Sequence, residues 1–218
     1  MEKTDMDLAA RRSRWRKAER ELSRLFPDPK IALHYSNPWE LAVAVQLSAQ
    51  CTDKKVNEVT PALFKKYPTL DAYVRAGKTP AGIREFEKRI HQCGFYRAKT
   101  KNILGAAKIV KEKFHEELPR TMEEMVTIPG MGRKSANVVL GNAYGVVEGI
   151  AVDTHVKRLS RVIGLSRESD PVKIERDLMA IIPKKDWFRA TYLLIDYGRK
   201  YCVARPHDHA RCPLTKIL

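Results

Sequence analysis

Apolar residues recur along this chain at the spacing of α-helices, and the alternation typical of strands is nearly absent. Residues 8–26 show the pattern first, with one apolar stripe and arginines on the other sides. The apolar members are Leu8, Trp15, Ala18, Leu22 and Leu25, and the arginines are Arg11, Arg12, Arg14, Arg16, Arg20 and Arg24. The arginine-rich sides predict either a solvated face or contacts with phosphate. The sequence "FPDP" ends this helix.

Further helical patterns follow, separated by Pro and Gly signals such as "KYP", "AGKTP" and "CGF". We expect helices over residues 39–51, 53–66, 69–76, 80–91, 97–115, 171–182 and 186–198. Apolar and aromatic residues around the last helix are expected to pack against the first helix through Trp15 and Leu22. The pattern as a whole predicts an all-α chain.

The segment "IPGMGRKSANVVL", residues 128–140, predicts a hairpin of two helices. A capping box at Thr121 and Glu124 starts the first helix, which stops at Pro129-Gly130. The second helix starts at Gly132, with Ala136, Val139, Leu140 and Ala143 on one face. A Gly-x-Gly turn presents backbone N–H groups at a helix N-terminus, where anions bind. Glycines suit such a turn because they tolerate positive φ and let a phosphate approach the backbone.

The charge of the chain indicates which anion this turn binds. Lys and Arg number 41 and Asp and Glu 26, a net charge of +15, which favours nucleic acid as the partner. A basic membrane-surface protein is the competing class. No stretch is apolar enough to span a bilayer, and the N-terminus lacks the apolar core of a signal peptide, so we expect a cytoplasmic protein without a membrane partner. The four cysteines do not form a secreted disulfide framework.

Two residues near the hairpin carry candidate chemistry. Lys134 lies beside Arg133 at the positive end of the second helix, where partial desolvation would lower its pKa and suit a nucleophilic amine. Asp153 precedes the pattern "THVKRLSRVIGL" and is the expected N-cap of the next helix. A solvent-exposed lysine and a purely structural cap are the simpler interpretations. The combination of hairpin, lysine and downstream "VDTH" favours a catalytic pair.

Several segments together resemble the endonuclease III family of helix-hairpin-helix DNA glycosylases. They are "LSAQCTD" (47–53), "CGFYRAKTKNI" (93–103), the hairpin, "AVDTHVKRL" (151–159) and "YGRKYC" (197–202). The resemblance implies a two-lobed fold with DNA between the lobes. One lobe is a six-helix barrel over residues 32–146 that ends with the hairpin, and the other joins residues 1–31 to 147–218.

The resemblance also implies roles for individual residues. Lys134 would be the nucleophile and Asp153 the essential carboxylate, facing each other across the cleft. Gln50 would fill the gap left by an extruded nucleotide, and Phe95 would lie against the complementary strand. The other implied DNA contacts are Gly130, Met131, Gly132, Arg133, Ser135 and His155.

The implied activity is that of a bifunctional DNA glycosylase and AP lyase in base excision repair. It would flip out oxidised pyrimidines, remove them and cut the strand by β-elimination through a lysine Schiff base. Double-stranded DNA with a damaged base or an abasic site is the expected partner, met at the nucleoid by a monomer. The alternatives are a mismatch or uracil glycosylase on the same scaffold and a non-catalytic DNA-binding module. The presence of both Lys134 and Asp153 argues against the non-catalytic module.

The chain departs from the family at its C-terminal cysteines. The family usually has four, spaced C-x6-C-x2-C-x5-C, around an iron-sulfur cluster. Here Cys202 and Cys212 occupy two positions, while His209 and Leu218 occupy the others. A 4Fe-4S cluster is therefore not expected, and we predict no cofactor and no metal ligands. Zinc on Cys202, His207, His209 and Cys212 is the alternative, with suitable ligand types but without the spacing of a standard finger.

Overall fold

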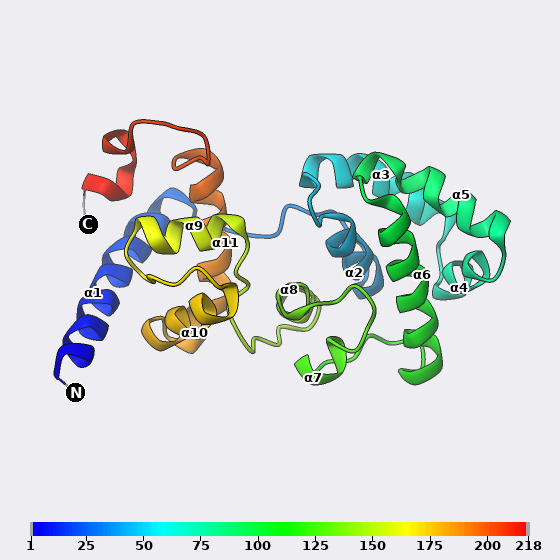
Figure 1. The fold of residues 1–218 in the computed structure, drawn as a ribbon, viewed down its shortest axis with the longest axis horizontal. Coiled ribbons are helices and arrows are strands. Elements are labelled where there is room, and N and C mark those ends of the chain that lie inside the picture. The colour runs from blue at the N-terminus through cyan, green and yellow to red at the C-terminus, as the bar shows by residue number, and fades with distance from the viewer. Residues whose placement is uncertain (1, 217–218) are drawn as a thin grey trace. The chain divides into compact units, whose positions relative to one another are not determined.

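The computed structural model describes residues 2–216, with side chains from residue 7 onward, and divides them into two compact units. One unit, here the central unit, spans Ala32–Val146. The other, the terminal unit, joins the residues up to Ile31 to those from Val147 onward. Helices and short 3-10 turns are the only regular elements in the described part of the chain, which confirms the all-α prediction (Figure 1). No helix in that part has the length and apolar run needed to cross a bilayer.

The central unit consists of seven α-helices and one 3-10 turn. They are α2 (Pro38–Leu47), α3 (Asp53–Lys66), α4 (Leu70–Gly77), α5 (Pro80–Ile90), η1 (His91–Cys93), α6 (Tyr96–Lys113), α7 (Met122–Met125) and α8 (Arg133–Tyr144). Side-chain oxygens of Asn37, Thr52, Thr69 and Thr79 each accept a hydrogen bond from the N–H three residues on, at the starts of α2 to α5. These caps satisfy N–H groups that have no partner inside the helix, and so fix where each helix begins.

Two of the predicted helices are shorter in the structure. The helix expected over 39–51 ends at Leu47, because Gln50 adopts a left-handed φ of 52° and Thr52 already caps the next helix. The helix expected from Thr121 is the four-residue α7, followed by turns up to Gly130. Thr121 caps it as predicted, with its Oγ1 3.3 Å from the backbone N of Glu124.

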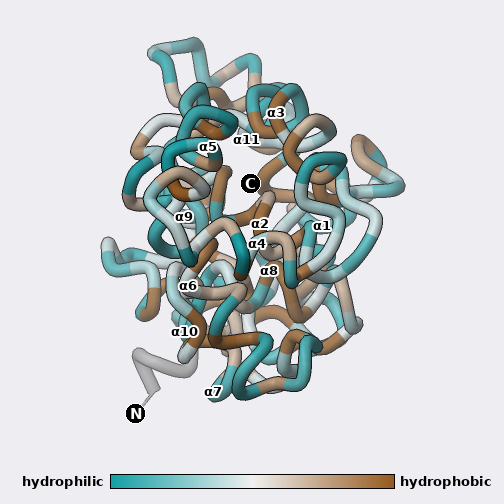
Figure 2. The backbone as a smooth tube through the Cα atoms, turned by 90° about the vertical axis from the view of Figure 1, so that its right-hand side faces the viewer, coloured by the Kyte–Doolittle hydropathy of each residue, from teal (hydrophilic) through white to brown (hydrophobic). Residues whose placement is uncertain are grey.

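The core of the central unit surrounds α2. Every residue from Leu41 to Leu47 is buried, and α2 packs against α3, α6 and α8. A cluster of aromatic rings, Trp39, Tyr67, Tyr73 and Phe86, joins α2 to α4 and α5, with centroid separations of 5.2 to 5.8 Å. Hydrophobic and hydrophilic residues alternate along many of the helices, as expected for helices with one buried face (Figure 2).

The terminal unit is built from both ends of the chain. It contains α1 (Glu2–Leu25), α9 (Thr154–Val162), α10 (Pro171–Ile181) and α11 (Trp187–Lys200), with the short turns η2 (Lys184–Asp186), η3 (His209–Arg211) and η4 (Pro213–Lys216). Trp15 and Leu22 of α1 share one buried cluster with Leu193 and Tyr197 of α11. The predicted packing of the last helix on the first is therefore confirmed. Cys202, Cys212 and Leu214 extend this cluster into the C-terminal segment.

Three arginines of α1 bind backbone carbonyls of their own unit. Nε of Arg11 donates to the carbonyl of Leu165 at 2.8 Å, and Nη1 of Arg14 donates to that of Gly164 at 3.1 Å. Arg12 donates twice to the carbonyl of Ala180, in the last turn of α10. Carbonyls at helix C-termini lack intrahelical partners and carry partial negative charge. The structure thus gives these arginines a role that neither predicted alternative, solvation or phosphate contact, included.

Replacing Arg11 by methionine should destabilise the protein, because Arg11 also forms a 3.2 Å ion pair with Asp177 of α10 and is mostly buried. Methionine keeps the apolar stem but removes a donor from both the Leu165 carbonyl and the carboxylate. We expect the free energy of unfolding to fall by about 1–3 kcal/mol, measured by chemical denaturation. Arg16→Met is the matched control, since Arg16 is an exposed arginine of the same helix. Equal losses in the two variants would contradict the role assigned to Arg11.

Candidate functional site

The turn before α8 depends on a glycine at position 130. Gly130 has a φ of 76°, in the left-handed region that favours glycine. A Cβ at this position would lie 2.5 Å from Oε1 of Gln46 in α2 and 2.9 Å from Cβ of Asn102 in α6. The backbone of the turn is therefore pressed against two helices of the core, and any side chain at residue 130 would push it away.

Gly132 differs from Gly130 both in its backbone conformation and in the space around a Cβ. Its φ of −77° and ψ of 169° are extended values that any residue adopts, and a Cβ here would have no neighbour within 4 Å. Gly132 is the N-cap of α8, yet no side chain caps this helix. The expectation that both glycines serve positive φ is therefore correct for Gly130 only. At Gly132 the lack of a side chain leaves the uncapped N-terminus of α8 open to solvent.

Three predicted site residues follow in the first turn of α8. Arg133 and Lys134 are exposed and Ser135 is half-buried. In the protein without DNA, Lys134 is exposed to solvent, so the prediction that it is partly desolvated is wrong for this state. The reason is that the first turn of α8 lies at an open helix end. An amine in this position is accessible to a large substrate.

Met131, a predicted DNA contact, lies in the core instead. Its side chain is only 2% exposed, and its N–H donates to the carbonyl of Ile128 at 3.0 Å. The residue between the two glycines therefore anchors the turn through apolar packing, and its side chain cannot reach a ligand outside. Of the predicted DNA contact of Met131, only a contact through backbone atoms stays possible, and it stays a prediction.

Asp153 caps α9 in the terminal unit, as the sequence predicted. Its Oδ1 accepts a hydrogen bond from the N–H of Val156 at 2.8 Å, which leaves Oδ2 for other partners. His155 follows in the first turn of α9 and is half-buried. Burial lowers the pKa of His155, the charges of Arg158 and Arg199 act in the same direction, and the Asp153 carboxylate opposes them. Burial thus disfavours the charged form of His155.

The ring of His155 rests against α11 at Gly198, within the "YGRKYC" segment. A Cβ at position 198 would lie 2.8 Å from Nδ1 of His155 and 3.1 Å from Cδ1 of Leu159. The glycine thus permits the close approach of α9 and α11 that fixes the first turn of α9. Asp153 and His155 are brought together in this unit, whereas the hairpin, Gln50 and Phe95 belong to the central unit.

Gln50 and Phe95 lie on two exposed turns of the central unit, and both have a backbone conformation that is uncommon for residues other than glycine. Both adopt left-handed φ values, 52° for Gln50 and 46° for Phe95. Gln50 is exposed and Phe95 is 66% exposed, a large apolar side chain held in solvent. Strained backbone and an exposed aromatic residue are both typical of a binding surface.

A residue that the sequence analysis missed joins these two turns. Lys99 of α6 is 6% exposed, and its Nζ donates to the carbonyl of Leu47 at 2.8 Å and to that of Cys93 at 2.7 Å. Leu47 ends α2 just before Gln50, and Cys93 ends η1 just before Phe95. Desolvation by burial lowers the pKa of Lys99. Its position in "CGFYRAKTKNI" gave no signal, because surface lysines are common and burial is not visible in a sequence.

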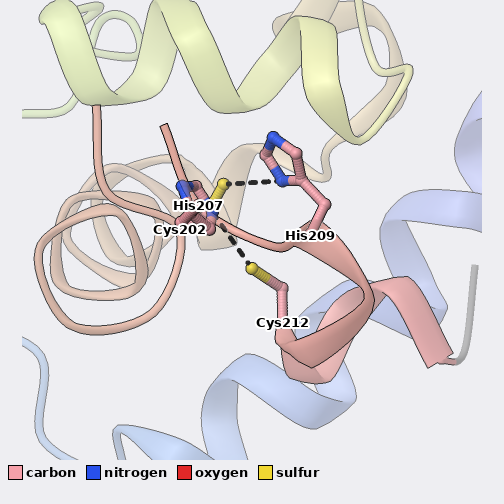
Figure 3. Close-up of side chains that lie close together, drawn as sticks. All are labelled: Cys202, His207, His209 and Cys212. Carbon is pink, nitrogen blue, oxygen red and sulfur yellow. Dashed lines mark hydrogen bonds between the residues drawn. The ribbon is translucent and has the colours of Figure 1, made fainter. Parts of the chain in front are cut away.

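The C-terminal segment brings four potential metal ligands together, Cys202, His207, His209 and Cys212 (Figure 3). One ligand atom from each lies within 4.8 Å of all the others. The prediction that no metal or cofactor is held is therefore not confirmed. Leu218, assigned to the fourth cysteine position, lies outside the described residues.

These residues do not fit a 4Fe-4S cluster. Such a cluster takes four cysteine thiolates, each on a different iron, and the group offers only two. A cubane also occupies the space between its ligands, whereas these four atoms are close enough to share one ion. The donor set is that of a single-ion site.

Comparisons with known proteins identify the family of this chain. The model of the "HhH-GPD superfamily base excision DNA repair protein" family matches residues 43–184. Endonuclease III of Synechocystis is 46% identical over 196 residues, covering 90% of this chain and 87% of the relative. Endonuclease III of Bacillus subtilis is 44% identical over 194 residues, covering 88% and 86%.

Solved structures extend the likeness to three dimensions. A non-covalent endonuclease III–DNA complex is 40% identical, with a TM-score of 0.88 and 94% of each chain covered. A trapped endonuclease III–DNA covalent intermediate matches with the same values. A thermostable thymine-DNA glycosylase, 18% identical with a TM-score of 0.74, shares the fold. The chain therefore belongs to the HhH-GPD superfamily of base excision DNA repair proteins and, within it, to the endonuclease III family.

Proposed function

We propose that this protein, a DNA glycosylase and AP lyase of base excision repair by its family, removes oxidised pyrimidines with Lys134 as nucleophile and Asp153 as the essential carboxylate. The observation that carries the proposal is the open N-terminus of α8. Neither the backbone conformation of Gly132 nor contacts inside the protein require a glycine there, and Lys134 is exposed two residues later. The solved complex of a related endonuclease III with DNA supports duplex DNA as the partner.

The hairpin is proposed to bind a DNA phosphate. The positive end of α8 favours a negative charge, and without a Cβ at Gly132 a phosphate oxygen can approach the backbone closely. Arg133 and Ser135 follow Gly132 in the first turn of α8. Such contacts fix the register of the protein on the duplex and are independent of the base sequence.

Gln50 and Phe95 are proposed to act on the base stack. A base inside a duplex is out of reach, so its nucleotide must be extruded at a cost of about a few kcal/mol. Gln50 would fill the space that the extruded nucleotide leaves, and the exposed ring of Phe95 would lie against the complementary strand. His155, next to the Asp153 cap in the first turn of α9, is also proposed to contact DNA.

The chemistry then proceeds at the sugar. Asp153 accepts a proton from the ammonium of Lys134, and the free amine attacks C1′ as the bond from C1′ to the base breaks. The base leaves with the electron pair of that bond and takes up a proton. Opening of the sugar ring gives an imine between Lys134 and C1′. Loss of a proton from C2′ then expels the 3′ phosphate by β-elimination, and water releases the enzyme.

A covalent route of this kind is supported by the trapped covalent intermediate of a related endonuclease III with DNA. The amine of Lys134 favours a combined glycosylase and lyase over the alternative of a mismatch or uracil glycosylase that only removes the base. Every step above uses protein side chains, so the chemistry requires no cofactor. We further propose that the protein acts as a monomer on DNA in the cytoplasm, at the nucleoid.

Lys134→Gln should abolish covalent capture of DNA while leaving DNA binding, because it removes the nucleophile and keeps the phosphate contacts. Borohydride added during reaction with a duplex carrying an abasic site should trap a protein–DNA adduct with the native protein only. Asp153→Asn should still bind DNA but react about 10²–10⁴-fold more slowly. An adduct formed by Lys134→Gln at the native rate would rule out Lys134 as the nucleophile.

Substitutions of the two glycines of the turn should change the free energy of unfolding in different ways. Gly132→Ser should leave the free energy of unfolding unchanged or raise it by a few tenths of a kcal/mol, because serine is a good N-cap residue. It should nevertheless weaken binding to any duplex, since its side chain occupies the N–H groups and blocks the phosphate. Gly130→Ala should lower stability by about 1–3 kcal/mol through left-handed strain and overlap with Gln46.

Thermal unfolding and fluorescence anisotropy with an undamaged duplex measure the two effects separately. If Gly132→Ser bound DNA as tightly as the native protein, α8 would not be the phosphate site.

The choice of base should be visible in a panel of duplexes that each carry one lesion. Single-turnover cleavage should be fastest on oxidised pyrimidines and slow on a thymine or uracil mismatch, because oxidised pyrimidines are the proposed substrates and a damaged base is cheaper to extrude than an intact one. An undamaged duplex is the control for background nicking. Faster release of uracil or mismatched thymine than of every oxidised pyrimidine would favour the alternative substrate class.

A further inference from the structure

We propose that Cys202, His207, His209 and Cys212 bind one zinc ion that holds the C-terminal segment in place. The site lies within the terminal unit and is independent of the catalytic proposal. It also replaces the expectation that the chain holds no metal. Four protein ligands complete the coordination of zinc, so the ion is structural and leaves no position for substrate.

The distances suit a tetrahedral ion. With bonds of about 2.3 Å to sulfur and about 2.0 Å to nitrogen, neighbouring sulfur and nitrogen ligands lie about 3.5 Å apart. Sγ of Cys202 lies 3.8 Å from Nδ1 of His209, and Sγ of Cys212 lies 3.4 Å from Nε2 of His207. Figure 3 shows the four side chains converging on one point, with these two pairs joined by dashed lines. The ligand atoms need only small shifts to surround one ion.

The protonation of His207 is already set for metal binding. Its Nδ1 lies 2.9 Å from the carbonyl oxygen of Arg205, which can only accept a hydrogen bond. Nδ1 must therefore carry the proton of the neutral ring, and Nε2, which faces Cys212, is left with its lone pair. A hydrogen bond from the outer nitrogen of a histidine to a backbone carbonyl is the usual support of a metal ligand.

Burial and charge favour a bound dication. Cys202 is 1% exposed and Cys212 is 4% exposed, so two thiolates here would be costly without a compensating charge. Two thiolates, two neutral imidazoles and Zn²⁺ sum to zero charge. Tetrahedral coordination by two sulfur and two nitrogen atoms is diagnostic of zinc when a cluster is excluded.

An entry path for the ion is present. His209 is exposed, and a cavity of about 340 Å³ is lined by Arg14, Cys202, His209, Cys212 and Leu214 among others. The ion can therefore enter from solvent without unfolding the terminal unit, and a chelator can remove it.

The four ligands come from just after the end of α11 and from the short C-terminal segment of the terminal unit. Cys202 follows α11, and the other three ligands lie in a segment whose only regular elements are the short turns η3 and η4. Beyond the ligands, the N–H of Leu214 donates to the hydroxyl of Tyr197, and η4 packs against α1. Zinc would close the loop of residues 203–211 and seat η4 on the core of the unit.

Metal analysis of the purified protein tests the site directly. We expect about one zinc per chain and no iron. Cys212→Ser should lower the zinc content to near zero, whereas Cys51→Ser and His34→Gln should retain it, because Cys51 and His34 belong to the central unit. Lys134→Gln should also retain zinc, so a failure of the catalytic proposal would leave this result unchanged.

A second measurement covers the case in which Cys212→Ser does not fold. Removal of zinc from the native protein by a chelator should lower its melting temperature, and one equivalent of zinc should restore it. Cobalt added to the chelated protein should give the absorption of thiolate-bound tetrahedral cobalt. Iron at about four per chain, a disulfide between Cys202 and Cys212 in metal-free protein, or a failure to take up added zinc would each overturn the proposal.

Discussion

The close packing of the Gly130 backbone against α2 and α6 is the contact on which the candidate site depends. Because no Cβ separates Gly130 from Gln46 and Asn102, the turn lies directly on the core of the central unit. Burial of Met131 adds apolar packing to the same turn. With the turn fixed on both sides, α8 must begin at Gly132 and present Lys134 in its first turn. The helix end that carries Lys134 is thus held by residues outside the proposed catalytic pair.

Much of the helical architecture was accessible from the sequence, because its signals are local. The periodic apolar stripes, the Thr121 cap and the Asp153 cap all depend on residues within one or two turns, and each is found in the structure. Helix ends were predicted less well where two local signals compete, as between Leu47 and Thr52. There the left-handed Gln50 and the cap of the following helix shorten α2.

The features that the sequence could not supply all depend on contacts between distant residues. The pattern "PGMG" makes its two glycines look alike, but only Gly130 touches a neighbouring helix. The arginines of α1 were predicted to meet water or phosphate, whereas three of them bind carbonyls that lie 150 to 168 residues away in the sequence. The spacing of Cys202, His207, His209 and Cys212 matches no standard finger, yet the fold of the segment brings their ligand atoms together.

The buried ammonium of Lys99 has a consequence for how the two exposed turns behave. A lysine has three donors and no acceptor, and here two of them hold the carbonyls that precede Gln50 and Phe95. If either turn moved away, the buried ammonium would lose one of the two carbonyls it binds, which is costly away from water. Order in one turn would therefore favour order in the other. With Gln50 and Phe95 contacting DNA as proposed, the ammonium of Lys99 would link the two contacts inside the protein.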